Sequence, residues 1–584
     1  MSQTPASSLR PPALAKRCLP KALRDINLFS PAAFLVSLAT CALIVYPMVI
    51  VVYNVFIADG SSTLNLIHQI ADDRILAVLF NTVAVIGASV IVATIIGSLF
   101  AWLVERTDIG MKGLTRFLPM LPVLVPPIAG AIGWVLLASP RSGFLNRWAL
   151  NAASMLGIES TQAVINIYSW GGLVFVFSIY LVPNVFLSVS SHLKNLDPAI
   201  EEAARMSGAG AWQTLTKVTI PSVKPAVMAG MILALIMGLS LFSLPAVIGM
   251  PADIELLAVR VVKLMTASYP PQTGTALMLA LIVAVVIGSA WWVQSRILAG
   301  KNFSTIGGRG IRAAEVKLGI YRTPARILLL LYLAVSSILP FFALVVVSFQ
   351  PFWTPVIRFQ NLGLSNYKTV FIDTAYSQGA LINSVFLGML GATVGMALAA
   401  VIAFFIDRNK KTLAAAVIDS TTKLPAAVSH LVIAIAFVVS LSGAPFYLHG
   451  TILILLLAYI VLYIPQATLS ASTALSQVGP QLAEAALMAG ASQGRVFFRV
   501  TLPLMLPGLV AGWTLLFVLI SGDITASALL AGSRNPVVGF VILELWSNGS
   551  FPQLAALGTV ITLLSSVVVL TTMYLSNRSL RNAR

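Results

Sequence analysis

Two short segments, far apart in the chain, repeat the same residue types at the same spacing. In both, a Glu-Ala-Ala triplet is followed after three residues by Gly, and further on by Pro. The repeated residues are Glu202, Ala203, Ala204, Gly208 and Pro221 in the first segment, and Glu484, Ala485, Ala486, Gly490 and Pro503 in the second, all related by one constant offset. Small methyl side chains permit close approach of another surface. The pattern indicates a docking element. The alternative, a loop that only closes a helix bundle, gives no reason for the repetition.

Each segment is predicted to form a short helix and a sharp turn. Pro198 suits the first helical turn, Asp197 can cap it, and Gly208 can end it in a left-handed conformation.

One face of each short helix is predicted to be small and apolar. Residues three or four apart are neighbours on a helix, so Ile200 lies with the alanines of the first segment and Leu482 with those of the second. A second amphipathic stretch, 212–218, is expected to end at Pro221 and Pro225.

No constellation in the sequence points to catalysis. Gly-x-x-x-x-Gly-Lys-Ser/Thr does not occur, so the phosphate-binding loop of an ATPase is absent from the sequence. The histidines are scattered, which is typical of loop or interface residues. They are His68, His192, His430 and His449. Cys18 and Cys41 are expected to be unpaired thiols. The chain is predicted not to be an enzyme, and to bind no metal or cofactor itself.

The composition is that of a membrane protein. Of 584 residues, 58% are hydrophobic and 9% are charged, and the mean hydropathy is +0.94. Soluble domains have about 25% charged residues. The net charge of +17 lies between apolar runs rather than on one soluble face, which argues against nucleic-acid binding.

Twelve runs are long enough to cross a membrane as helices, which takes about 20 apolar residues. They lie near 31–56, 81–104, 117–138, 167–190, 225–249 and 275–295, and then near 327–349, 381–405, 423–442, 450–470, 507–530 and 555–576. The third is interrupted by four prolines, among which Pro126 and Pro127 can bend it, and Lys423 and Pro425 open the ninth.

Lys and Arg concentrate after every second run, as Arg106 and Lys112 do after the second run and Arg408 and Lys410 after the eighth. Cytoplasmic loops hold this excess, so both termini are predicted to be cytoplasmic.

The two sets of six runs form a parallel internal repeat. Asn81 and Asn383 open the second and eighth runs, and Arg106 and Arg408 close them, so that Asn383 lies as far beyond Asn81 as Arg408 lies beyond Arg106. We interpret the asparagines as helix caps. Both halves have the same predicted orientation, so the repeat is parallel rather than inverted.

The predicted fold is an all-α membrane protein. Its parts are an N-terminal tail (1–30), a first half (31–297, with the repeated loop 197–225), a basic linker (298–326), a second half (327–576, with the repeated loop 479–507) and a C-terminal tail (577–584).

Asp523 is the one acidic residue well inside a predicted span, and the first-half counterpart region 239–243 is uncharged. Ionisable groups inside a membrane mark functional sites by default. Asp523 is a candidate for a translocation path, where it would steer a cation or support a gate. The alternative is a carboxylate bonded to neighbouring hydroxyl groups near the outer end of the span.

The repeated loops resemble the signature loop of binding-protein-dependent ABC importer permeases. The resemblance rests on Glu-Ala-Ala, three residues, Gly and a distal Ile-Pro or Leu-Pro, here Ile220-Pro221 and Leu502-Pro503. The duplicated arrangement covers nearly the whole chain and is similar to the fused permeases of the ferric-iron type.

This resemblance implies a type I permease in the bacterial inner membrane that forms the solute path of an ATP-driven importer. Each repeated loop would be a coupling helix on one of two ABC ATPase subunits, which bind the ATP and Mg²⁺. An extracytoplasmic solute-binding protein would deliver the cargo.

The resemblance favours ferric iron as the solute, with 2-aminoethylphosphonate, thiamine or polyamine as alternatives. The rival class is an ion-coupled secondary transporter, which would need coupling charges in several spans where this chain offers Asp523. A structural scaffold would not need the repeated loops.

Overall fold

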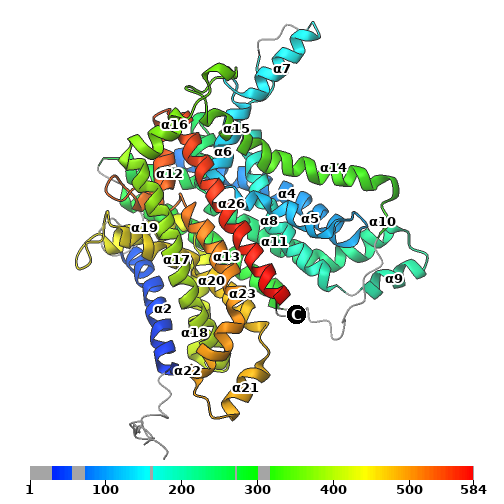
Figure 1. Ribbon diagram of the computed structural model, residues 1–584, viewed down its shortest axis with the longest axis vertical. Helices are drawn as coiled ribbons and strands as arrows, with labels where there is room; N and C mark the ends of the chain where they lie inside the picture. Colours follow the sequence, from blue (N-terminus) through cyan, green and yellow to red (C-terminus); the bar gives the residue numbers. More distant parts are fainter. Residues whose placement is uncertain are drawn as a thin grey trace, which may run out of the picture.

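The computed structural model describes residues 29–54, 73–157, 162–196, 198–269, 272–299 and 316–582 (Figure 1). Within these ranges the chain is helical, without a β-strand, and Thr107 and Val316 form an isolated parallel bridge. Ten of the described helices are long and apolar enough to cross a membrane, and two bent pairs bring the number of candidate spans to as many as twelve. Cys18, His68 and most of the predicted linker lie outside the described residues, and Cys41 is a buried free cysteine.

The elements of the first half are α2 (Phe29–Tyr53), α4 (Asp73–Arg106), α5 (Lys112–Phe117), η2 (Leu118–Leu124), α6 (Pro127–Ala138), α7 (Phe144–Met155), α8 (Trp170–Asn195), α9 (Pro198–Met206), α10 (Ala211–Thr214), η3 (Leu215–Thr219), α11 (Ile220–Ser240), η4 (Pro245–Gly249), η5 (Met250–Ala252), α12 (Leu257–Thr266) and α13 (Thr273–Ala299). Those of the second half are η6 (Gly319–Tyr321), α14 (Arg322–Leu333), η7 (Ala334–Ile338), α15 (Leu339–Ser348), η8 (Phe359–Asn361), α16 (Ser365–Lys368), η9 (Thr369–Asp373), α17 (Ala375–Arg408), α18 (Leu413–Lys423), η10 (Leu424–Ala427), α19 (His430–Leu441), α20 (Ile452–Ser476), α21 (Pro480–Met488), α22 (Gln493–Val496), η11 (Phe497–Thr501), α23 (Leu502–Ser521), α24 (Ser527–Leu530), α25 (Val538–Ser547) and α26 (Phe551–Asn582).

The two halves repeat the same packing. Helix α8 packs against α4 and α11, and α20 packs in the same way against α17 and α23. Helices α4 and α17 each have 34 residues, and both ends of α17 are displaced from those of α4 by the offset that separates Asn383 from Asn81. The duplication inferred from the sequence is therefore a duplication of helices and of their neighbours.

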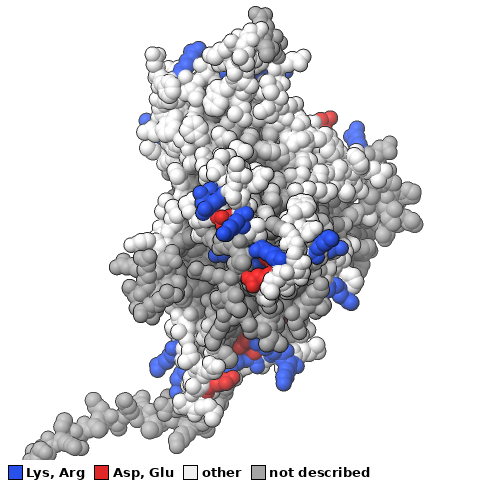
Figure 2. All heavy atoms as spheres, turned by 90° about the vertical axis from the view of Figure 1, so that its right-hand side faces the viewer, with Lys and Arg blue, Asp and Glu red and all other residues white. Residues whose placement is uncertain are grey.

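Much of the surface is uncharged. On the face that carries α14, charged side chains gather in a few mixed groups separated by broad uncharged areas (Figure 2). Leu35, Val83 and Ile95 are more than half exposed, as expected for side chains that face lipid.

The third and ninth predicted spans are broken rather than continuous. The helical segments Gly113–Val123 and Pro127–Ala138 meet at 86°, and Leu413–Ala427 and His430–Leu441 meet at 106°. Pro126 and Val428 have extended backbone at the two bends. The residue before a proline avoids the helical region, so the Pro126-Pro127 pair breaks the first of these spans.

The fifth and eleventh predicted spans end earlier than expected. Helix α11 ends at Ser240 and α23 at Ser521, although the predicted spans continued to 249 and 530. Apolar residues continue in both stretches, but they form separate short helices (η4, η5 and α24) instead of extending the long helix. Asp523 therefore lies just beyond its long helix, in the connection to α24.

The interpretation of Asn81 and Asn383 as helix caps was wrong, because α4 and α17 begin well before them. The Asn81 amide donates to the carbonyl oxygen of Glu255 at 3.2 Å, and the Asn383 amide donates to that of Pro536 at 2.8 Å. Each asparagine thus ties a long helix to the connection after the fifth span of its half.

The next residue in each half completes this tie. The hydroxyl oxygens of Thr82 and Ser384 accept hydrogen bonds from the first N–H groups of α12 and α25, at 2.9 and 2.8 Å. The long helix therefore caps the short one from outside its own segment.

The first span of each half packs against the other half. Helix α2 lies along α17, α18 and α19, and α14 and α15 lie along η2 and α6 (Figure 1). The Tyr332 hydroxyl donates to the carbonyl oxygen of Ile179 at 3.1 Å, and the Phe34 and Phe405 rings are 5.8 Å apart. The exchange interlocks the two halves.

Helices α6 and α15 cross most closely at Gly133. A Cβ atom built on Gly133 would lie 2.4 Å from the carbonyl oxygen of Pro340 and 2.7 Å from its Cα. These are backbone atoms, so a side chain cannot be accommodated by a rotamer change. The crossing requires glycine.

We expect Gly133→Ala to lower the stability of the protein by about 2 kcal/mol, because overpacking forces the backbones apart. Gly87→Ala is the matched control, since a Cβ atom on this helical glycine meets nothing within 4 Å. Thermal unfolding of the detergent-solubilised protein measures both. Equal unfolding temperatures for the two variants would contradict the close crossing.

Candidate functional site

The repeated loops have the same local structure in both halves. We call residues 198–219 (α9, α10 and η3) the first loop, and residues 480–501 (α21, α22 and η11) the second loop. Every helix in the second loop begins and ends at the residue that corresponds to its counterpart in the first, at the offset that separates Glu484 from Glu202. Helix α9 projects from the body at the right of the molecule, and α21 projects at its lower end (Figure 1).

Glycine ends both short helices as predicted. Gly208 and Gly490 have φ angles of 87° and 84°, which glycine adopts without strain. The N–H of Ala209 bonds to the carbonyl of Ala204 at 3.1 Å, and that of Ala491 bonds to the carbonyl of Ala486 at 3.0 Å. This is the Schellman arrangement, and it makes each turn rigid.

Pro221 and Pro503 do not end the second helical stretch, contrary to prediction. The candidate spans Trp212–Ser240 and Gln493–Ser521 run through them, and both prolines lie in the first turn of a long helix. A π-helical turn, η3 or η11, precedes each proline. The wider turn re-satisfies the backbone where proline lacks an N–H group. Each loop is thereby continuous with its transmembrane helix.

The repeated residues lie on the outside of the two short helices. Glu484, Ala203 and Ala485 are exposed, and Glu202, Ala204 and Ala486 are partly buried. Apolar side chains continue this surface: Ile200 and Leu482 are 48% and 55% exposed, and Met206 and Met488 are 89% and 90% exposed. The two loops present the same exposed surface, which includes large apolar groups.

The first loop is anchored by a buried ion pair. Glu201 Oε1 lies 3.5 Å from Arg106 Nε and accepts a hydrogen bond from the Thr219 hydroxyl at 2.8 Å. Arg106 and Glu201 are each only about 4% exposed, and Arg106 also donates to the carbonyl oxygen of Leu196 at 3.1 Å. Adjacent glutamates thus divide the roles, because Glu201 points inward and Glu202 lies at the surface.

The second loop is anchored by apolar contacts. Ala483 takes the position of Glu201 and is 4% exposed. The Phe404 and Phe497 rings are 5.0 Å apart, and the Arg408 guanidinium lies 5.4 Å from the centre of the Phe404 ring. Thr501, the counterpart of Thr219, has a buried hydroxyl without a hydrogen-bond partner among the described residues. Because Ala483 stands where the first loop has Glu201, the Thr501 hydroxyl has no carboxylate to donate to.

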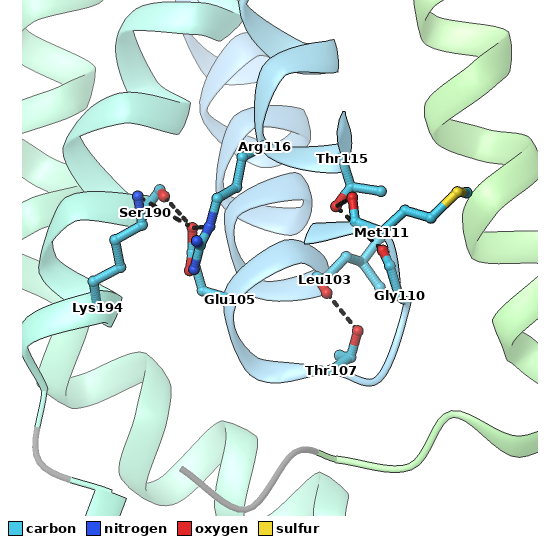
Figure 3. Close-up of polar contacts among 9 residues, drawn as sticks. All are labelled: Leu103, Glu105, Thr107, Gly110, Met111, Thr115, Arg116, Ser190 and Lys194. Carbon is cyan, nitrogen blue, oxygen red and sulfur yellow. Dashed lines mark hydrogen bonds and ion pairs between the residues drawn. The ribbon is translucent and has the colours of Figure 1, made fainter. Parts of the chain in front are cut away.

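A second ion cluster braces the helices above the first loop (Figure 3). Glu105 accepts two hydrogen bonds from Arg116, at 3.0 and 2.7 Å, and one from the Ser190 hydroxyl at 2.7 Å. The Lys194 ammonium group is 3.6 Å from the same carboxylate. The cluster joins the ends of α4 and α8 to α5.

Sequence reasoning missed both Glu201 and Glu105 as anchors. It used Arg106 as a marker of membrane orientation and of the internal repeat, and not as the partner of an acid. The available signal was the scarcity of acids, 19 against 36 basic residues. Because acids are scarce, one that lies next to a basic helix end is a candidate partner in an ion pair.

The family model described as "Binding-protein-dependent transport system inner membrane component" matches residues 90–298 and 391–582. The two matches cover more than half of the chain and coincide with the two halves. The chain belongs to this family. It is a multi-pass inner membrane protein and a permease of an ABC importer.

Curated relatives span most of the permease. It is 23% identical to the ferric transport system permease protein FbpB of Actinobacillus pleuropneumoniae, over 90% of this chain and 75% of that one. It is also 23% identical to a putative ferric transport system permease protein FbpB 1 of Haemophilus influenzae, over 81% of this chain and 73% of that one. A crystal structure of a bacterial alginate ABC transporter matches 44% of the permease and 96% of the solved chain, with 17% identity and a TM-score of 0.38.

The candidate path residue lies apart from the loops. Asp523 is 7% exposed and accepts a hydrogen bond from the Tyr463 hydroxyl at 2.9 Å and one from the N–H of Ala526 at 2.9 Å. The predicted contact with a hydroxyl group is therefore present, and it comes from another helix of the permease.

We expect Glu201→Ala to lower the stability of the permease by about 3 kcal/mol, because it leaves the Arg106 charge buried and unpaired. Glu202→Ala, one residue on, should change stability by less than about 0.5 kcal/mol, as surface substitutions do. Thermal unfolding in detergent separates them. Replacing both partners, Arg106→Met with Glu201→Leu, should restore most of the loss. A stable Glu201→Ala single variant would contradict the anchor.

Proposed function

We propose that this permease couples ATP hydrolysis on two ATPase subunits to solute uptake through its first and second loops. The observation that carries the proposal is the repetition of the loops in structure and in exposed surface. Two equivalent docking surfaces suit two copies of one partner, as a pseudosymmetric membrane subunit on a symmetric pair of ATPases requires. The loop end of the permease would then be cytoplasmic, with both termini on that side.

Rigidity supports a role in transmitting force. Each short helix has a Schellman turn, a buried anchor and a continuous helical connection to a long span. Closure of the ATPases would draw the loops together and rock the two halves, which opens the central path outward. A solute-binding protein would deliver cargo at the opposite end, as the family description implies.

We expect Glu202→Lys combined with Glu484→Lys to lower ATP-driven uptake at least about tenfold, because reversed charge on both surfaces repels the partner's basic groups. Uptake is measured in proteoliposomes that contain the ATPase and binding protein. Insertion and unfolding temperature should be unchanged. Asp373→Lys is the charge control, since Asp373 is exposed and lies outside both loops. Uptake at the wild-type rate in the double variant would refute coupling through these surfaces.

Ferric iron is the solute that we propose. The support is the similarity to two ferric transport permeases along most of their length. Wild-type proteoliposomes should accumulate radioactive iron only when ATP and the binding protein are present. 2-Aminoethylphosphonate, thiamine and polyamine are tested in parallel, and ATP-dependent uptake of one of these without iron uptake would replace iron as the solute.

A further inference from the structure

A buried polar cluster lies at the end of α23. One oxygen of Asp523 accepts hydrogen bonds from the N–H groups of Ala526 and Ser527, at 2.9 and 3.4 Å. The other accepts from the hydroxyl of Tyr463 on α20 at 2.9 Å. The Ser527 hydroxyl donates to the Asp523 carbonyl oxygen at 2.6 Å and bonds to the Tyr459 hydroxyl at 2.8 Å. The carboxylate is held in one orientation by backbone and side chains together.

His430 extends this cluster from a third element. Its ring lies edge-on to the Tyr463 ring, with centroids 5.4 Å apart and planes at 85°. The side chain is partly exposed, although residues 431–437 that follow it in α19 are all buried. No hydrogen bond from the described part of the chain reaches its imidazole.

The cluster lies where the two halves meet and both broken spans bend. His430 is the first residue of α19, directly after the 106° bend. A Cβ atom on Gly522 would lie 3.5 Å from Pro126, the residue at the bend of the first half. In transporters built from repeats, solute sites form at the repeat interface from discontinuous helices. Irregular backbone is tolerated at this depth only inside protein or along a cavity.

The corresponding positions of the first half do not repeat this cluster. At the offset that relates the two loops, Asp523 corresponds to Leu241 and Tyr463 to Leu181. Helices α6 and α19 each have 12 residues, and at the offset that relates them His430 corresponds to Pro127. Leu181 is buried. The two loops keep the same residue types at corresponding positions of the two halves. These three positions do not, so the fold alone does not explain their polar groups.

We propose that Asp523, Tyr463 and His430 form a transient binding site for a metal cation in transit between the two halves. The inference rests on the proposed function and specifies where the transported ion would bind within the translocation path. A carboxylate and a phenol are hard oxygen donors, and imidazole suits iron among other metals. The Tyr463 hydroxyl oxygen and one Asp523 carboxylate oxygen lie 2.9 Å apart, so one ion can contact both.

Binding exchanges the phenol proton of Tyr463 for the metal and releases that proton to water. Asp523 contributes the negative charge, and His430 contributes a neutral nitrogen. Three protein ligands leave the other coordination positions of the metal to water or to a small-molecule ligand of the metal. The ion is therefore held weakly enough to leave. Conduction requires a site of this kind, with binding that favours entry without preventing exit.

The first experiment measures binding to the full chain in detergent. Ferric citrate is titrated in, and phenolate-to-iron charge-transfer absorption in the visible range is recorded. Wild type should show the band and Tyr463→Phe should lose it. Tyr269→Phe, which alters a fully exposed tyrosine, should keep it. A wild-type chain without the band, or a Tyr463→Phe chain that retains it, overturns the site.

The second experiment measures ATP-driven iron uptake in proteoliposomes. Asp523→Asn keeps an oxygen acceptor for the N–H of Ala526, removes the negative charge and replaces the oxygen that faces Tyr463 with an amide NH₂ group. It should lower the maximal rate at least about tenfold. Ser527→Ala is the structural control, because it removes hydrogen bonds of the cluster without a proposed ligand. ATPase activity stimulated by the binding protein should persist in Asp523→Asn.

The two proposals fail in different ways. If wild type takes up another solute and no iron, the proposed solute is wrong and the cation site falls with it. If wild type takes up iron and Asp523→Asn and Tyr463→Phe match its rate, the permease assignment stands and the cation site is wrong.

Discussion

Backbone polar groups inside a membrane must find partners within the protein, and this constraint governs the architecture. Two spans are broken, at Pro126 and Val428, and each break exposes backbone that lipid cannot satisfy. The first spans cross over to the opposite halves, where α15 packs on α6 and α2 packs on α19. The halves therefore cover one another's broken helices. The close crossing at Gly133 follows, because a side chain there would separate α6 from α15 and uncover the bend.

The two loops reach the same shape through different physics. The first is held by a buried carboxylate and guanidinium, whose desolvation cost is offset only while both are present. The second is held by an alanine and an aromatic pair, which require no charge balance. Both solutions satisfy the same need, a short helix that cannot rock independently of its transmembrane span. The outer residues were not free to diverge in this way, since Glu202 and Glu484 remain at equivalent positions and face outward.

The centre of the molecule shows the opposite behaviour. There the architecture repeats, but the residues do not: Asp523, Tyr463 and His430 correspond to Leu241, Leu181 and Pro127 of the first half. A path that carries one solute at a time has no need for two equivalent sites. It needs a charge placed where the solute passes, with the surrounding hydrogen bonds fixing its direction. Asp523 has this environment, because Tyr463 and two backbone N–H groups hold its carboxylate.

The sequence by itself determined the helical fold, the parallel repeat and the surfaces of the two loops. These depend on hydropathy and on local preferences, such as a left-handed glycine after a short helix, that act within a few residues. Prolines also marked the third and ninth spans as interrupted, because proline disfavours a continuous helix without defining the angle of the bend. Three features are visible only in the folded molecule. The first span of each half packs against the other half, and Asn81 and Asn383 bond to distant connections instead of capping helices. Glu201 faces inward, whereas Glu202 faces outward. Those outcomes depend on contacts between residues that are far apart in the chain, and on sequence grounds several partners were equally available to each.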